Sequence, residues 1–367
     1  MKLFLILISI LLLVSQSYSQ DDIGADLQQN RWDVFVKRND ADPSRTDVIF
    51  INLLSGDETT LSAPGERFTL TSGGVIYFDL AERQVKLGKA DGIVRNHPFI
   101  IANSETRRVD WVVSEDREWI VWTISRQVAD GQLITATWLA DVGGAEVREL
   151  LVYGPRDGIQ LLPIGIGKDL REVFMEAHAF GSERLSAYTR RTGLFALVLA
   201  DDGLVTRALP GDQSCFCAVG FGANVMLRLA PNPAKGGLDV EVFRLDGDGG
   251  DPQVIPALSR GSYSEGGNIV LSADGKQAVY ALSQVGGAAD EDVEMRSVVI
   301  HVDIENGRQR IVGSPLPGLI RPLRFGAENR AALIALEQHD RTLKVDLEDG
   351  RLIEVAGAVY LGQLGEH

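Results

Sequence analysis

The stretch GNIVLSADGKQAVYALSQVGGAADEDVEMRSVVIHVDIENGRQRIVG, residues 267–313, decides the fold. It contains four short apolar or alternating runs, at 269–271, 278–282, 298–302 and 308–312. A Ser-Ala-Asp-Gly turn separates the first two runs, an acidic loop separates the middle two, and Asn306-Gly307 separates the last two. Short runs joined by Gly, Asn and Asp turns predict an antiparallel sheet of four strands.

The first turn of this stretch recurs along the chain. An apolar residue is followed by Ser or Gly, then by any residue, then by an acidic residue or Asn, and the Ser or Gly falls at positions 114, 167, 222, 272 and 326. These positions are 53, 55, 50 and 54 residues apart, and a β-type run follows each one. Asp and Asn bond to their own backbone in tight turns and Gly tolerates positive φ, so each copy predicts the same hairpin.

A second turn motif ends the third run of each unit. Asp303-Ile304-Glu305-Asn306-Gly307 and Asp346-Leu347-Glu348-Asp349-Gly350 are nearly identical, and Asn52 to Gly56 is a weaker copy. Two turn motifs in fixed order within each unit indicate that one four-stranded element repeats through the chain.

Repeats of roughly 40 to 55 residues, each with four strands, predict an all-β fold, a β-propeller. The units predict seven blades in a single domain at 32–364, near 32–61, 66–90, 109–153, 160–210, 215–258, 267–313 and 319–355. The first unit lacks a leading strand, and 356–361 is a spare apolar run. We expect this C-terminal run to complete the first blade and close the ring, because closure removes two exposed sheet edges. The alternative is six blades, with 32–90 as one blade.

Two turns carry a resemblance to a known group. Val112 to Asp116 and Val270 to Lys276 resemble the apolar-Ser-x-Asp-Gly-Lys signature of TolB-like and WD-repeat-like propellers of exported bacterial proteins. The resemblance covers about residues 109–355, and Arg117 stands where those families have Gly. It implies a protein-binding or scaffold role more than chemistry, although a fold alone does not fix a function.

The charge and the N-terminus indicate where the protein works. A formal net charge of −15 argues against a nucleic-acid or anionic-membrane partner, since such partners require clustered Lys and Arg. Residues 1–19 have the pattern of a signal peptide, with Lys2, an apolar run from Leu3 to Val14 and small residues before Gln20. That run is too short for a bilayer span of about 20 residues, so we expect export to the periplasm or the medium without stable membrane insertion. Residues 20–31 are polar and predict a flexible arm.

The two cysteines, Cys215 and Cys217, leave two alternatives open. On an extended strand their Cα atoms would lie about 6.5 Å apart, at the outer limit for a disulfide. Two buried thiols are the simpler interpretation, and a strained bridge is the other. A secreted domain of this size need not depend on disulfides for its stability.

Two acidic segments are candidate cation or partner sites. Closely spaced carboxylates on a Gly-rich loop resemble a calcium loop at Asp246, Asp248 and Asp251. This loop lacks the later Glu of an EF-hand, and a plain hairpin has the same composition, so no cofactor is required. The second segment has the acidic residues Asp290, Glu291, Asp292 and Glu294. A solvated face is the simpler interpretation of this loop, and a partner or cation site is the alternative.

Signals for catalysis are weak in this sequence. Sialidase-like boxes place Gly one position later than Gly275, and no Gly-x-Ser-x-Gly elbow of a serine hydrolase occurs. The five histidines show no metal-ligand spacing. Trp119 and Trp122 fall on opposite faces of one strand, which favours packing between blades over a sugar-stacking platform.

These observations favour an exported, non-catalytic propeller that binds an unknown protein or glycan partner of the cell envelope. The first alternative is a propeller hydrolase or lactonase with channel-facing carboxylates and a divalent cation. The second is a structural surface or filament subunit. Convergence of three or more acidic or Asn side chains at the channel mouth would favour the enzyme.

Overall fold

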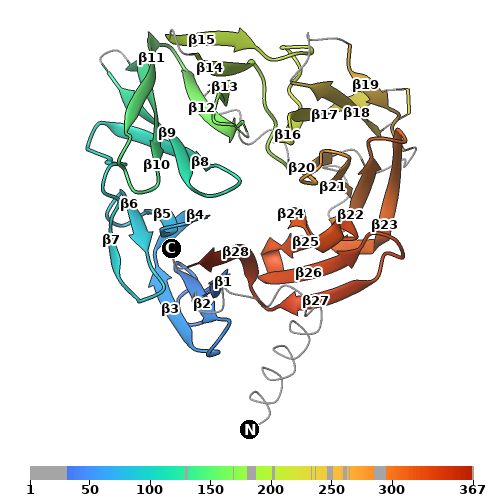
Figure 1. Cartoon of the computed structure of the whole chain (residues 1–367), viewed down its shortest axis with the longest axis horizontal. Coiled ribbons are helices and arrows are strands. Elements are labelled where there is room, and N and C mark those ends of the chain that lie inside the picture. Colours follow the sequence, from blue (N-terminus) through green and yellow to red (C-terminus); the bar gives the residue numbers. More distant parts are fainter. Residues whose placement is uncertain are drawn as a thin grey trace.

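The computed structural model describes residues 31–128, 131–167, 169–179, 187–200, 203–232, 234–235, 237–245, 251–258, 263, 265–284 and 295–365. Seven four-stranded antiparallel sheets stand around a central channel as the blades of a propeller (Figure 1). The prediction of an all-β propeller with seven blades is confirmed, and the alternative of six blades is wrong.

The first four blades run in chain order around the ring, and each is given from its innermost strand outward. Blade 1 contains β28 (Val359–Gly365), β1 (Arg31–Arg38), β2 (Thr46–Asn52) and β3 (Glu58–Ala63). Blade 2 contains β4 (Gly65–Thr71), β5 (Gly74–Asp79), β6 (Gln84–Gly88) and β7 (Val94–Asn96). Blade 3 contains β8 (Thr106–Val113), β9 (Trp119–Gln127), β10 (Leu133–Asp141) and β11 (Arg148–Arg156). Blade 4 contains β12 (Ile159–Ile166), β13 (Glu172–Ala179), β14 (Leu194–Ala200) and β15 (Gly203–Ala208).

The last three blades follow the same order. Blade 5 contains β16 (Ala218–Gly222), β17 (Val225–Asn232), β18 (Gly237–Arg244) and β19 (Gln253–Ile255). Blade 6 contains β20 (Glu265–Leu271), β21 (Gln277–Gln284), β22 (Arg296–Asp303) and β23 (Arg308–Pro317). Blade 7 contains β24 (Arg321–Phe325), β25 (Ala331–Leu336), β26 (Arg341–Asp346) and β27 (Leu352–Ala356), with the short 3-10 turns η4 (Ala327–Asn329) and η5 (Glu337–His339).

Blade 1 closes the ring because its inner strand comes from the C-terminus. β28 pairs antiparallel with β1, from Arg31 opposite Gly365 to Val36 opposite Val359. The ring of Tyr360 on β28 lies 5.2 Å from that of Phe35 on β1, between centroids. The expected completion of the first blade by the C-terminal run is therefore confirmed.

The Ser-x-Asp turns are structural joints between the first and second strands of a blade. Ser272 Oγ donates to Asp274 Oδ1 at 2.6 Å and accepts from the backbone N–H of Gln277 at 3.0 Å. The Ser114 turn repeats these bonds with Asp116 and Trp119. The pKa of Asp274 is lowered, first by the Ser272 hydroxyl and then by a backbone N–H, which stabilise its charged form.

The core lies between neighbouring blades rather than inside any one of them. Trp111 and Trp122 pack with Ile76 and Val85, so they join blades 2 and 3. Trp119 packs instead toward blade 4, against a cluster that includes Val173. Trp119 and Trp122 thus lie on opposite faces of β9, as the alternation predicts, and Trp122 is fully buried between blades.

Cys215 and Cys217 form a disulfide, with Cα atoms 5.4 Å apart. The interpretation of two buried thiols is therefore wrong. The strand geometry assumed for it does not apply, because Cys215 leaves a turn and only Cys217 enters an isolated β-bridge, to Arg191.

The N-terminal predictions are not tested by this structure. The expected signal peptide at 1–19 and all but the last residue of the expected arm at 20–31 lie outside the described residues. Within the part of the chain that is described, no helix has both the length and the apolar character needed to cross a membrane.

Candidate functional site

A cavity of about 650 Å³ opens among the inner strands of blades 2, 3 and 4 and the segment that precedes β14. This volume falls within the range of about 300 to 1,000 Å³ that is typical of small-molecule sites. Three acidic residues line it: Glu66, Asp110 and Glu176. Five basic residues line it as well: Arg67, Arg107, Arg108, Arg190 and Arg191. Arginines thus gather around this cavity in a chain whose net charge is −15.

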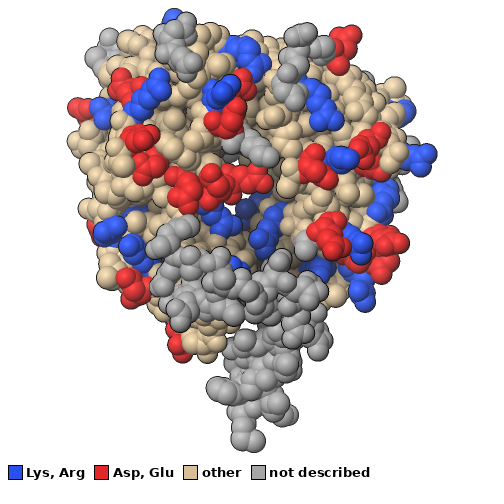
Figure 2. Space-filling view, in the orientation of Figure 1, with Lys and Arg blue, Asp and Glu red and all other residues tan. Residues whose placement is uncertain are grey.

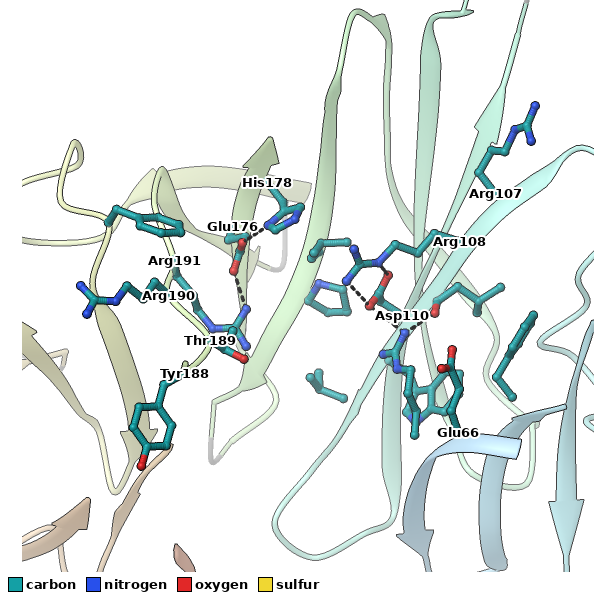
Figure 3. A pocket seen from close by; sticks show the side chains of 18 of the residues that line it. Glu66, Arg107, Arg108, Asp110, Glu176, His178, Tyr188, Thr189, Arg190 and Arg191 are labelled. Carbon is teal, nitrogen blue, oxygen red and sulfur yellow. Dashed lines mark hydrogen bonds and ion pairs between the residues drawn. The ribbon is translucent and has the colours of Figure 1, made fainter. Parts of the chain in front are cut away.

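Asp110 on β8 is the centre of one charged cluster (Figure 3). Its carboxylate accepts from Arg67 Nη1 at 2.7 Å and from Arg108 Nε at 2.6 Å and Nη2 at 3.1 Å. The guanidinium of Arg67 also lies 4.5 Å from the centroid of the Trp111 ring, a cation–π contact. The Arg67 guanidinium therefore covers one face of the Trp111 ring, and this part of the cavity wall presents charged groups rather than an open aromatic face.

The backbone of β4 explains how Arg67 reaches this cluster. The pairing of β4 with β5 shifts register between Glu66 and Thr69, and Arg67 adopts a positive φ of 61° within the shift. A residue other than Gly in that conformation costs about 1 kcal/mol or more, so the surrounding contacts must hold it there. The bonds of Arg67 to Asp110 and to the Val109 carbonyl are such contacts.

Glu176 on β13 is the centre of a second charged cluster. Glu176 and His178 are two residues apart on the strand, so their side chains share one face. His178 Nδ1 lies 2.6 Å from Glu176 Oε1, and Arg191 Nη1 bonds to Glu176 Oε2. Glu176 is 1% exposed, which means that its charge depends on these two partners rather than on water.

The segment 187–191 forms the wall that carries Arg191, and neighbouring elements anchor it. Arg191 exchanges two backbone hydrogen bonds with Cys217, at 2.8 and 3.0 Å. The Tyr188 hydroxyl lies 2.5 Å from Ser283 Oγ in blade 6, and burial raises the pKa of this phenol. Arg190 Nη2 contacts Glu265 at 2.6 Å. The wall is thus held by blade 6 and by the disulfide loop.

Exposure separates the groups that a ligand can reach from those that it cannot. The side chains of Arg67 and Arg191 are 32% and 25% exposed, whereas those of Asp110 and Glu176 are 9% and 2% exposed. The arginines therefore face the cavity, and the carboxylates lie behind them. Arg107, in contrast, points away from the two clusters (Figure 3). Acidic and basic side chains also border the central opening on the face shown in Figure 2.

The residues predicted from sequence do not form this site. Asp246 and Asp248 lie outside the described residues, and Asp251 is exposed at the end of that segment. Asp290, Glu291, Asp292 and Glu294 lie outside the described residues too. Among the residues that the structure describes, no group of three or more His, Cys, Asp or Glu side chains could hold a metal ion.

The sequence reasoning missed the arginines and the Glu176–His178 pair. A signal was present, because the paired arginines Arg107-Arg108 and Arg190-Arg191 stand out in an acidic chain. Their convergence was not visible, since more than 80 residues separate the two pairs and only the ring brings blades 2 to 4 around one cavity.

No protein-family model matches the chain, and no curated protein matches it. Among solved structures it is similar to a puromycin hydrolase, with a TM-score of 0.56 and 15% identity, over 96% of this chain and 55% of that one. A puromycin-hydrolyzing peptidase of Mycobacterium tuberculosis has a TM-score of 0.54 and 14% identity, over 86% and 50% of the two chains. A TolB-like protein of Agrobacterium tumefaciens has a TM-score of 0.42 and 13% identity, over 80% and 91%.

These likenesses concern the fold. The chain spans about half the length of the two hydrolases that it matches. At such low identity the shared feature is the β-propeller, which hosts many unrelated functions.

Proposed function

We propose that this protein is an exported, non-catalytic β-propeller that binds a partner ligand in its central cavity. One observation carries the proposal: the cavity's buried carboxylates, Asp110 and Glu176, are each held by arginines. A carboxylate that accepts hydrogen bonds from a guanidinium has fewer lone pairs left for a cation or a water molecule. A cavity wall of this kind is suited to binding a ligand rather than to catalysis with a metal ion.

Two further features support export and a place among TolB-like propellers. A disulfide persists in oxidising compartments such as the periplasm or the medium, and Cys215–Cys217 fits that location together with the leader at 1–19. The Ser114 and Ser272 turns, which carry the resemblance to the TolB-like signature, form the same Ser–Asp hydrogen bond. The candidate calcium loop at 246–251 and the acidic loop at 290–294 stay as predictions of cation or partner contacts.

A hydrolase is the second candidate, and the Glu176–His178 pair favours it. A histidine oriented by a carboxylate at a cavity wall is the usual arrangement of a general base. Arg191 shares the same carboxylate, however, and the described part of the cavity wall adds no Ser or Cys nucleophile to the pair.

Thermal-shift measurements with a panel of small organic molecules test the binding function. Thr189 is exposed and lines the cavity, so Thr189→Trp fills it, while Thr60→Trp on the outermost strand β3 is the matched control. We expect ligands that raise the melting temperature of the wild type and of Thr60→Trp, but not of Thr189→Trp. Shifts that persist in Thr189→Trp would place binding elsewhere. Turnover of a model ester that chelation or His178→Ala abolishes would establish the hydrolase instead.

A further inference from the structure

We infer that the ligand of the cavity is an organic dicarboxylate, whose two acidic groups bind the arginines of the Asp110 cluster and the Glu176 cluster; this rests on the proposed function. The clusters stand on different walls, one on β4 and β8 and the other on β13 and segment 187–191 (Figure 3). A ligand with one acidic group can bind the arginines of only one cluster at a time. A ligand with two acidic groups can bind those of both clusters.

The arginines are suited to carboxylates in particular. Arg108 already forms a two-point contact with the Asp110 carboxylate, and Arg191 accommodates one oxygen of Glu176. A guanidinium carries five N–H donors in a planar fork that matches two carboxylate oxygens. Arg67 and Arg191 each use Nη1 in the bonds described above and keep about a quarter to a third of the side chain exposed, so further donors face the cavity.

Part of the cavity lining is apolar. Its apolar lining residues include Leu162 and Pro163 on β12, Val112 on β8, and Phe216 of the disulfide loop. An inorganic ion would leave this surface in contact with water, because a cavity of about 650 Å³ is far larger than one oxyanion. A hydrocarbon body between two carboxylates would bury it and gain hydrophobic free energy.

The arginines of the wall favour an anionic ligand. Removing an anion from water is compensated only where charged donors replace its hydration. The wall supplies these donors, and the rest of an acidic chain repels anions, so binding is expected at this place and to weaken as salt rises.

Isothermal titration calorimetry with the series of linear dicarboxylates from succinate to azelate tests the inference. Nonanoate, which has one acidic group, and inorganic phosphate are the comparison probes. We expect at least one dicarboxylate to bind the wild type at least tenfold more tightly than either comparison probe.

Variants on both walls locate the contacts. Arg67→Gln and Arg191→Gln should each weaken dicarboxylate binding by about 10- to 100-fold, as expected for loss of a charged hydrogen bond. Both are expected to fold, since Asp110 keeps Arg108 and Glu176 keeps His178. Arg67→Lys and Arg191→Lys keep the positive charge but remove the planar pair of N–H donors, so they test whether the guanidinium geometry is needed for binding. Arg148→Gln, an exposed arginine on the outermost strand β11, removes the same charge far from the clusters and should leave the affinity unchanged.

The outcomes separate this inference from the proposed function. If no dicarboxylate binds, or if Arg67→Gln and Arg191→Gln bind like Arg148→Gln, the inferred ligand class is wrong. The binding function would still be supported if ligands of the thermal-shift panel raised the melting temperature of the wild type but not of Thr189→Trp. If nothing binds in the cavity by either method, both proposals fail.

Discussion

His97 gives this propeller a sensitivity to mild acid that can be worked out from its surroundings. The ring is 5% exposed, packs edge-on against Phe99 with 4.4 Å between centroids, and accepts the Ile100 N–H at Nδ1 over 3.2 Å. Burial, with a smaller contribution from the charge of Arg95, lowers the pKa of His97 to about 4 from its ordinary value of 6.5. Protonation would put a second hydrogen where Nδ1 now accepts one.

The sign follows from this lowered pKa. The unfolded chain takes up a proton near its ordinary pKa while the folded protein does not, so stability is lost as the pH falls from about 6.5 toward 4. Between pH 8 and pH 5 the loss from His97 comes to about 2 kcal/mol, and below pH 4 it levels off at about 3 kcal/mol.

His97→Asn is the matched variant, because Asn Oδ1 stands close to the position of Nδ1 and can still accept from Ile100. Its free energy of unfolding should be lower at pH 8, owing to the lost contact with Phe99, but should not show the His97 part of the decline toward pH 5. Urea denaturation at each pH, followed by tryptophan fluorescence, measures both. Parallel pH profiles for the wild type and His97→Asn would refute the assignment.

Two other perturbations test ring closure and the site wall. Arg117 sits at φ 66° where the equivalent turn has Gly275 at φ 68°, and its guanidinium donates to the Gln363 carbonyl on β28. Arg117→Gly relieves about 1 kcal/mol of strain but loses a charged hydrogen bond of about 1.5 to 3 kcal/mol, so we expect net destabilisation and faster hydrogen exchange in β28; unchanged exchange there would contradict this. Reduction of Cys215–Cys217 opens a very short loop and should cost about 1 to 2 kcal/mol in the chain-entropy account. It should also weaken any cavity ligand, because Cys217 pairs with Arg191 and Phe216 lines the cavity, and Cys215→Ser/Cys217→Ser should reproduce both effects without reductant.

The fold was predictable from sequence because its information is local and repeated. The Ser272 and Ser114 turns and the Asp303 and Asp346 turns each specify a hairpin through bonds within a few residues. Several copies of these turn motifs agree in spacing, so a misread copy has little effect on the predicted fold. Closure by β28 was predictable too. The first unit lacked a strand and the C-terminus had a spare one, and pairing the two removes two exposed sheet edges.

The candidate site was not predictable, because it depends on contacts between distant residues. Arg67 reaches Asp110 only through a register shift in β4, and no residue type announces that shift. Arg191 reaches Glu176 across the connection between β13 and β14. The disulfide was misjudged for a related reason, as the distance between Cys215 and Cys217 depends on the turn before them rather than on their spacing.

The site arises where the chain departs from its own repeat. A turn that follows the motif bonds to itself, as Ser272 and Asp274 do, and so has few donors left for a ligand. Arg67 in the shifted part of β4 and Arg191 in segment 187–191 have no counterpart in the turn motifs, and each directs a guanidinium toward the cavity. The uniform blades hold these two departures in place, because each is anchored to other elements: Arg67 to β8 of blade 3, and segment 187–191 to β13, to Cys217 and to β21 of blade 6. Replacing either segment with a regular turn should therefore preserve the fold and abolish ligand binding. If these segments served only to pack the blades, the same replacement would destabilise the fold instead.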